Sequence, residues 1–180
     1  MPVTLEPVGP HHQAGFLSAV RDSRALHRPW VSPPSTPAAY RRLLERVRDE
    51  RFIAWLVRTS DGDLAGMIEA SEIVRGVFCS AYLGFYAFIP FDARGFMRAG
   101  LARAVRELFT THGLHRLEAN IQPGNERSMA LVRSLGFRRE GYSPRYLKIG
   151  GRWRDHERWA VTREDWSARG ARSRRRKGAP

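Results

Sequence analysis

The chain has 180 residues, of which 42% are hydrophobic and 11% aromatic, values that fit one globular domain and exclude a disordered protein. No apolar run approaches the about 20 residues that a membrane-spanning helix needs, and the first residues lack a signal-peptide pattern, so we expect a cytoplasmic protein with no membrane partner. The single cysteine, Cys79, excludes an intrachain disulfide, and the net charge of +13 points to an acidic partner or cofactor.

The positive charge is uneven along the chain. Residues 167–180 contain five arginines, one lysine and no acid, so this segment carries +6 of the total +13. It has no apolar side chain larger than alanine to bury, and we therefore expect a disordered basic tail after a domain that spans residues 1–166. Two interpretations of the tail stay open: a nonspecific solubilising segment, and an arm that contacts RNA or the ribosome.

The first quarter of the chain predicts one strand and two helices. A strand is expected at Thr4–Pro7, followed by an amphipathic helix with Phe16, Leu17 and Val20 on its apolar face. The proline-rich segment Arg28–Pro37 predicts a loop. A second helix is expected from Pro37 to about Arg51, since Thr36 is a good N-cap and proline favours the first helical position.

The middle of the chain alternates strands and helices. Strands are expected at Arg51–Arg58, Leu64–Ile73 and within Val77–Phe88, the first two joined as a hairpin through a Ser-Asp-Gly-Asp turn. A long helix is expected at Gly95–His112, and then a strand at His115–Gln122, where apolar and polar residues alternate.

The last elements complete the predicted fold. A helix is expected at Asn125–Leu135, with Asn125 as its N-cap and Gly136 as its stop. Two strands, about Phe137–Ile149 and Arg152–Val161, are joined by a Gly-Gly turn. The order of elements predicts a single α/β (α+β) domain, with a central, mixed, mostly antiparallel sheet and helices on both faces.

The turn before the long helix predicts an anion site. Gly95 lets the backbone approach a ligand closely, Arg94 adds a cation, and the first amides of the helix lack intrahelical partners. An ordinary glycine turn is the alternative explanation. The chain has neither a Walker A motif nor GxGxxG, so a nucleoside triphosphate or a dinucleotide lacks support as the ligand.

Polar residues with catalytic potential follow this turn. Glu118 is expected on the polar face of a central strand, where a carboxylate can act as general base, and Ser128 is expected in the first turn of the next helix, where a hydroxyl can donate a proton. Structural roles are the alternatives: an arginine partner for Glu118, and helix capping for Asn125 and Ser128.

Together these motifs resemble the GNAT superfamily of acyl-CoA-dependent N-acetyltransferases. The superfamily signal consists of Arg94-Gly95-x-Met97, Asn125-x-x-Ser128 and Leu135-Gly136-Phe137. The later motifs are similar to the ribosomal-protein-alanine N-acetyltransferases, the RimJ/RimL branch, and include Tyr146-Leu147, Gly151-x-Trp153-Arg154-Asp155-His156 and Asp165-Trp166. One departure is Asp92-Ala93 in the phosphate loop, because an aspartate beside a diphosphate is unfavourable unless it points outward.

The resemblance implies acetyl-CoA as cosubstrate and no metal. The residues that it implies for acetyl-CoA are Tyr86, Ala87 and Phe88 near the thioester, Arg94, Gly95, Phe96 and Met97 at the diphosphate, and Asn125 at the pantetheine arm. A backbone N–H near Ala87 or Phe88 would stabilise the oxyanion, and Ser128, or alternatively Tyr146, would protonate the leaving thiolate.

The acceptor implied by the resemblance is the N-terminal α-amine of a ribosomal or other protein. An α-amino group has a pKa of about 8, so roughly a tenth of it is neutral at pH 7, and Glu118 acting through water would be base enough. A small-molecule amine is the alternative acceptor. A noncatalytic RNA- or ribosome-binding factor on the same fold is the alternative function, and a monomer or a homodimer is expected.

Overall fold

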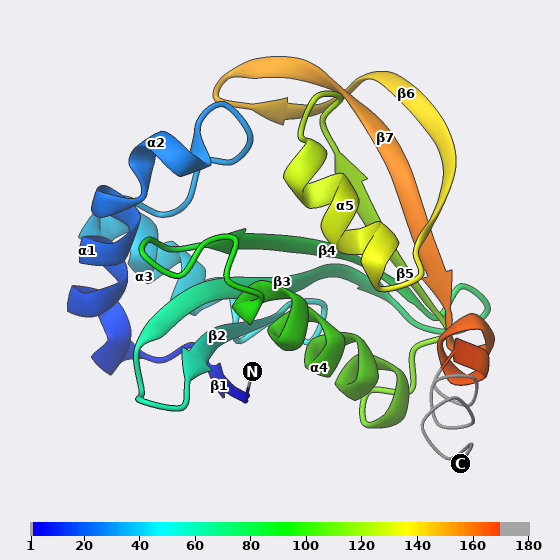
Figure 1. Cartoon of the computed structure of the whole chain (residues 1–180), viewed down its shortest axis with the longest axis horizontal. Coiled ribbons are helices and arrows are strands. Elements are labelled where there is room, and N and C mark those ends of the chain that lie inside the picture. The colour runs from blue at the N-terminus through cyan, green and yellow to red at the C-terminus, as the bar shows by residue number, and fades with distance from the viewer. Residues whose placement is uncertain (1, 170–180) are drawn as a thin grey trace, which may run out of the picture.

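The computed structural model describes residues 2–169 and contains one seven-stranded sheet (Figure 1). The strands are β1 (Val3–Pro7), β2 (Ile53–Thr59), β3 (Leu64–Val74), β4 (Ser80–Ala87), β5 (Arg116–Ile121), β6 (Arg138–Ile149) and β7 (Arg152–Thr162). They lie in the order β1-β2-β3-β4-β5-β7-β6. Every neighbouring pair is antiparallel except β4 and β5, which confirms the predicted mixed, mostly antiparallel sheet.

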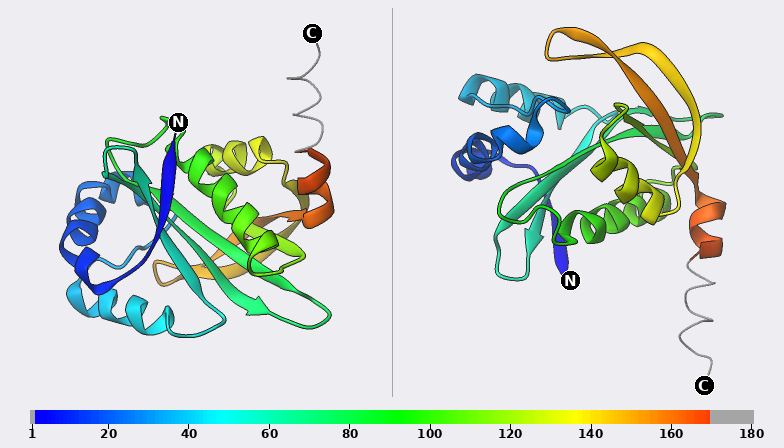
Figure 2. Two further views of the ribbon diagram at one scale, coloured as in Figure 1. Left: turned by 90° about the horizontal axis from the view of Figure 1, so that it is seen from below. Right: turned by 45° about the horizontal axis from the view of Figure 1, so that its top comes forward.

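Helices cover both faces of the sheet, as predicted. They are η1 (Pro10–His12), α1 (Gln13–Asp22), α2 (Arg24–His27), α3 (Pro37–Arg46), α4 (Phe96–Thr110) and α5 (Glu126–Ser134). Figure 2 shows α1 and α3 on one side of the sheet and α4 and α5 on the other. The single-domain α/β class is therefore confirmed.

The two layers of helices give the molecule two apolar cores, and β2 contributes to both. Trp55 and Val57 belong to the core under α4 and α5, whereas Ala54 and Leu56 belong to the core under α1 and α3. Successive side chains of a strand point to opposite faces, so the nearly continuous apolar run of β2 follows from its burial on both sides.

Both predicted N-caps are confirmed. The Thr36 hydroxyl accepts a hydrogen bond from the Ala39 amide at 3.1 Å, and the Asn125 side chain accepts one from the Ser128 amide at 3.2 Å. Each bond satisfies an amide at the start of a helix that has no partner within the helix. The side chains of Leu117 and Ala119 are buried and those between are not, as the alternation in β5 predicted.

Several predicted boundaries were wrong. The helix expected to reach about Arg51 ends at Arg46, and a turn follows it. The four-residue helix α2 was not predicted, because one turn gives too short a pattern for a periodicity. The strand expected within Val77–Phe88, which is β4, begins only at Ser80. Residues 76–78 before it form an exposed turn, in which Phe78 is 70% exposed.

The end of the described chain is helical. Residues 163–169 form a helix after β7, so the predicted domain boundary at residue 166 falls inside it. The remainder of the predicted basic tail, residues 170–180, lies outside the described residues. Among the helices of the described part, none is long and apolar enough to cross a membrane.

Candidate active site

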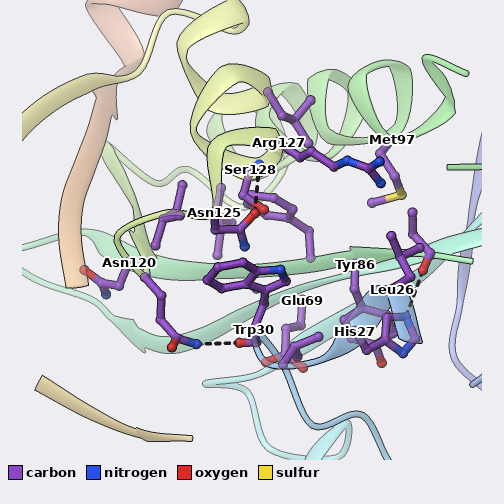
Figure 3. Close-up of a pocket in the computed structure, with 18 of the residues that line it drawn as sticks. Leu26, His27, Trp30, Glu69, Tyr86, Met97, Asn120, Asn125, Arg127 and Ser128 are labelled. Atoms are coloured by element: carbon purple, nitrogen blue, oxygen red, sulfur yellow. Dashed lines mark hydrogen bonds between the residues drawn. The ribbon is translucent and has the colours of Figure 1, made fainter. Parts of the chain in front are cut away.

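A cavity opens where β4 and β5 separate. The two strands pair only over Ser80–Tyr82 and Arg116–Glu118, and beyond this point they diverge. The resulting cavity has a volume of about 910 Å³. Figure 3 shows Asn125, Arg127 and Ser128 of α5 on one side of it, and His27, Trp30 and Glu69 on the other. The cavity also receives residues from the β6–β7 hairpin and from the start of α4.

One wall of the cavity is an open strand edge. The amide of Phe88 donates to the Ala65 carbonyl of β3 at 2.9 Å. In an antiparallel pair the bonded residues alternate, so the backbone groups of Ala87 and Phe85 point away from β3, towards the opening. The edge offers the N–H groups of Ala87 and Phe85 and the C=O group of Phe85 to an extended ligand, whereas the Ala87 carbonyl is bonded to His27. Phe88 does not, because its amide is already bonded, which corrects its expected role as an oxyanion donor.

The start of α4 supplies further backbone donors. Gly95 is the N-cap and has a φ of +85°, a left-handed conformation that suits glycine, and its carbonyl accepts the Ala99 amide. The amides of the first turn therefore stay available, and the helix dipole favours an anion there. Gly95 and Met97 line the cavity.

Arg94 and Phe96, which were also predicted to hold the diphosphate, differ from Gly95 and Met97 in their surroundings. The guanidinium of Arg94 lies 5.8 Å and 5.6 Å from the ring centres of Phe91 and Phe96, a cation–π arrangement. The Phe96 side chain is buried in the core under α4. Neither Arg94 nor Phe96 is among the side chains that line the cavity in the described part of the chain. Their roles at a diphosphate therefore stay predictions, for the exposed Arg94 guanidinium as for the Phe96 backbone amide.

Asp92 lines the cavity and has a partner. Its Oδ2 lies 3.3 Å from a guanidinium nitrogen of Arg127, which comes from the first turn of α5. The aspartate expected to disturb an anion site thus faces the site, and a neighbouring cation offsets part of its charge. The pair is partly exposed, so its attraction is screened by solvent.

The first turn of α5 faces the cavity with two predicted site residues. Asn125 uses its carbonyl oxygen for the cap, which leaves the side-chain NH₂ group for a ligand. Ser128 lies one turn into the helix and lines the same cavity. On β5 opposite, the side-chain oxygen of Asn120 is buried without a hydrogen-bond partner and also lines the cavity. Amide groups on both sides suit a ligand that carries amides of its own.

The far end of the cavity is aromatic. Tyr146 from β6 lies beside Tyr82 of β4, and this neighbour together with burial raises the pKa of Tyr82 to about 12, so the hydroxyl stays protonated. The ring of His156 lies 6.2 Å from that of Tyr146. Nδ1 of His156 hydrogen-bonds the Arg154 carbonyl at 3.0 Å, and burial lowers the pKa of the imidazole. Tyr146 is therefore in the cavity, as predicted, with a neutral histidine that was not predicted.

Glu118 does not join these residues. Its carboxylate accepts from Arg116 at 2.9 Å, and Arg116 also binds Glu140. Within the described residues Glu118 is not part of the cavity lining. Because the carboxylate is ion-paired and lies outside the cavity lining, the geometry favours the structural alternative for Glu118 over its predicted role.

Three contributors come from distant parts of the chain and were not among the predicted site residues. His27 bonds the Ala87 carbonyl at 2.9 Å, and the Gln122 side chain donates to the Trp30 carbonyl at 2.9 Å. These bonds hold the proline-rich loop and α2 against the open ends of β4 and β5. The third contributor is Glu69 of β3, which lines the cavity. A tryptophan in a proline-rich loop is the one local signal that the sequence offered.

The chain is similar to known acetyltransferases. A family model described as "Acetyltransferase (GNAT) domain" matches residues 3–138. The [Ribosomal protein uS5]-alanine N-acetyltransferase of Escherichia coli (strain K12) is 38% identical over 116 residues, 64% of this chain and 60% of that protein. The match thus spans less than two thirds of that relative.

Two further proteins extend the comparison over more of the chain. A Mycobacterium smegmatis structure described as RimJ in complex with CoA-disulfide has a TM-score of 0.82 and 29% identity, covering 91% of this chain and 83% of that one. The spermidine N(1)-acetyltransferase of Vibrio cholerae is 23% identical over 81% of this chain and 85% of its own length. The family model covers most of the domain, and this chain belongs to the GNAT acetyltransferase family.

Proposed function

We propose that the protein transfers the acetyl group of acetyl-CoA to an amine, and that the acceptor is the N-terminal α-amine of a protein. The observation that carries the proposal is the open edge of β4 beside the first turn of α4. The first turn offers amides to a diphosphate, and the edge offers the Phe85 backbone groups and the Ala87 N–H to the amides of a pantetheine arm.

The order of these elements orients the cosubstrate. The diphosphate lies at Gly95 and the following amides, and the pantetheine arm extends back along β4 towards the point where β5 rejoins it at Tyr82. Asn120 and Asn125 flank the arm from β5 and α5. The acetyl group then lies near Leu83–Phe85, somewhat before the Tyr86–Phe88 stretch expected from the sequence. The backbone N–H of Phe85 or Ala87 is the oxyanion donor in this arrangement.

Acyl transfer then needs the amine at the far end of the cavity. The neutral amine attacks the thioester carbon, the C–S bond breaks, and the thiolate takes a proton. Ser128, beside the pantetheine arm, and Tyr146, beside the acceptor, are both within the cavity and are the candidate donors.

The charge of the cavity favours an acceptor with a single positive charge. Its acidic side chains are Glu69, Glu72 and Asp92, and its arginines are Arg28, Arg98 and Arg127. Acids and arginines balance, and the whole chain carries +13, so a polyamine with several charges meets no concentrated negative potential. A protein N-terminus brings one ammonium group. The similarity to the E. coli uS5-alanine acetyltransferase agrees with this choice.

The test is acetyl transfer from acetyl-CoA to peptides that begin with alanine or serine, with spermidine as the competing acceptor. We expect the α-amine of the peptides to be acetylated, as read by mass spectrometry, and spermidine to be a poorer substrate. Failure to bind CoA in a calorimetric titration would refute the acetyl-transfer proposal. Preference for spermidine would refute the choice of acceptor only.

A further inference from the structure

A glycine opposite Glu69 lets its carboxylate reach the cavity. Glu69 of β3 pairs in register with Gly84 of β4. A Cβ at Gly84 would lie 2.9 Å from Cγ and 3.0 Å from Oε1 of Glu69, which is closer than real Cβ contacts. The Glu69 side chain therefore lies over the bare backbone of Gly84, across the strand that forms the open edge, and lines the cavity.

Glu69 is also a carboxylate without a partner. In residues 2–169 it makes no hydrogen bond or ion pair, although the sequence holds 31 lysines and arginines. Asp92, another acid of the cavity, is paired with Arg127. A half-buried carboxylate is costly to leave unpaired in the free protein, and such groups concentrate at functional sites.

The groups around Glu69 favour a raised pKa. Burial raises the pKa of its carboxyl, and Arg46 of α3 opposes this rise in part. Tyr86 of β4 faces it, and burial holds the pKa of that hydroxyl well above its usual range, so Tyr86 contributes no negative charge. His27 of α2 lies against Tyr86 with ring centres 5.2 Å apart, and burial lowers the pKa of its imidazole. Among residues 2–169, no cation therefore contacts the carboxylate.

The location matches the reacting end of the cosubstrate. With the diphosphate at α4 and the arm along β4, the acetyl group comes to Leu83–Phe85, and Gly84 lies in the middle of this stretch. Glu69 approaches Gly84 from the β3 side, whereas Asn125 and Ser128 approach from α5. The carboxylate and the proposed proton donor Ser128 therefore lie on different sides of the thioester, as an acid and a base for one transfer should.

Resting on the proposed function, we propose that Glu69 binds the ammonium group of the acceptor and removes one of its protons. The neutral nitrogen attacks the thioester carbon, a C–N bond forms and the C–S bond breaks. The hydroxyl of the proton donor gives its proton to the thiolate. It then takes the second proton of the attacking nitrogen, so the donor ends unchanged. Glu69 releases its proton to water. One acetyl group is transferred, and one proton leaves to solvent.

The proposal assigns the acceptor a chemical class, a primary amine that enters in its charged form. The charged form dominates near neutral pH because an α-amine has a pKa of about 8. Without Glu69 the amine must arrive neutral, so the rate of the Glu69→Gln variant should rise with pH up to the pKa of the amine.

The experiment compares wild type, Glu69→Gln and Glu45→Gln with acetyl-CoA and an alanine-starting hexapeptide from pH 6 to about 9. Glu45 is an exposed acid of α3 and serves as the matched control. We expect kcat/KM of Glu69→Gln to fall about 100-fold at pH 7 and the deficit to shrink towards pH 9, with CoA affinity unchanged. Gly84→Ala, which crowds the carboxylate, should show the same pH-dependent deficit in weaker form. Rates within about threefold of wild type, or a deficit equal at all pH values, would overturn the role of Glu69.

A second readout does not depend on turnover. In ¹³C-glutamate-labelled protein with bound CoA, the carboxyl resonance that disappears in Glu69→Gln gives the pKa of Glu69. The hexapeptide should lower this pKa, because a bound ammonium stabilises the carboxylate, and the N-acetylated hexapeptide, which lacks the charge, should not. Equal responses to the two peptides would overturn the proposal. Because CoA binding and peptide acetylation by the wild type test the proposed function by themselves, the two ideas fail separately.

Discussion

The two ends of the cavity are built in different ways. The proposed cosubstrate end is built largely from backbone, namely the first turn of α4 and the open edge of β4, whereas the proposed acceptor end consists of side chains from β3, β4, β6 and β7. The position of backbone donors depends on the path of the main chain, so it is compatible with many different side chains. Side-chain sites depend on particular residues that tertiary structure brings together. The first end therefore suits a cosubstrate shared by a family, and the second can vary with the acceptor.

The largest expected effect is on kcat, and it shows at which end of the cavity the proton donor lies. In the proposed arrangement the sulfur of CoA lies beside α5, so Ser128→Ala should lower kcat for an alanine-starting peptide about 100-fold, and Tyr146→Phe by about tenfold or less. CoA affinity, measured by calorimetry, should change little in either variant. If Tyr146→Phe is the more damaging change in kcat, the proton comes from the acceptor end.

The next effect tests whether backbone geometry holds the diphosphate. Gly95 has a φ of +85°, and valine there strains the turn by about 1–2 kcal/mol and displaces the first amides of α4. We expect acetyl-CoA affinity to fall at least about tenfold, which equals about 1.4 kcal/mol. Gly62→Val is the matched control, because Gly62 has a φ of +87° in the remote β2–β3 turn. Thermal unfolding should show a similar loss of stability in both variants, and equal CoA affinities would contradict a backbone site.

A smaller effect separates capping from ligand binding. Asn125→Ala and Thr36→Ala each remove a confirmed N-cap, so each should lower the free energy of unfolding by about 1 kcal/mol. Only Asn125 lines the cavity, and the loss of a hydrogen bond to the pantetheine arm should weaken CoA binding about fivefold. Denaturant titration and calorimetry measure the two quantities. Unchanged CoA affinity in Asn125→Ala would restrict this residue to its cap.

The smallest effect concerns the acid at the cosubstrate end. Asp92→Asn removes a negative charge near the proposed diphosphate site and frees Arg127, so CoA should bind about threefold more tightly at low salt. Because both side chains are partly exposed, the gain should largely vanish at about 1 M salt, where the Debye length is about 3 Å. A gain that persists at high salt would show that Asp92 acts through something other than its charge.

The sequence predicted the local structure of the proposed cosubstrate end far better than the side-chain contacts of the proposed acceptor end. The glycine turn and the Asn125 cap are local signals, because each depends on neighbouring residues and on backbone conformation. The catalytic interpretation of Glu118 depended only on the position of this residue on the polar face of a strand. Glu118 does lie on that face, but Arg116, two residues away on the same face, forms an ion pair with its carboxylate.

The boundary errors have a similar origin. The helix expected from Pro37 to about Arg51 ends at Arg46, whose guanidinium lies 3.9 Å from the ring centre of Phe52, the residue before β2. The one-turn helix α2 carries no periodicity of its own. It matters because His27 bonds Ala87, sixty residues later in the chain.

By itself, the sequence determined the fold class, most elements, both N-caps and the glycine turn at the start of α4. These features depend on periodicity, capping and turn residues, which act over a few positions. Tertiary structure alone decided which side chains meet at the acceptor end. The bond between Gln122 and Trp30 spans 92 residues, and the path of Glu69 over Gly84 depends on the register of two strands. Register and long-range contacts arise from packing of the whole domain, so the residues that choose the acceptor become visible only in the folded chain.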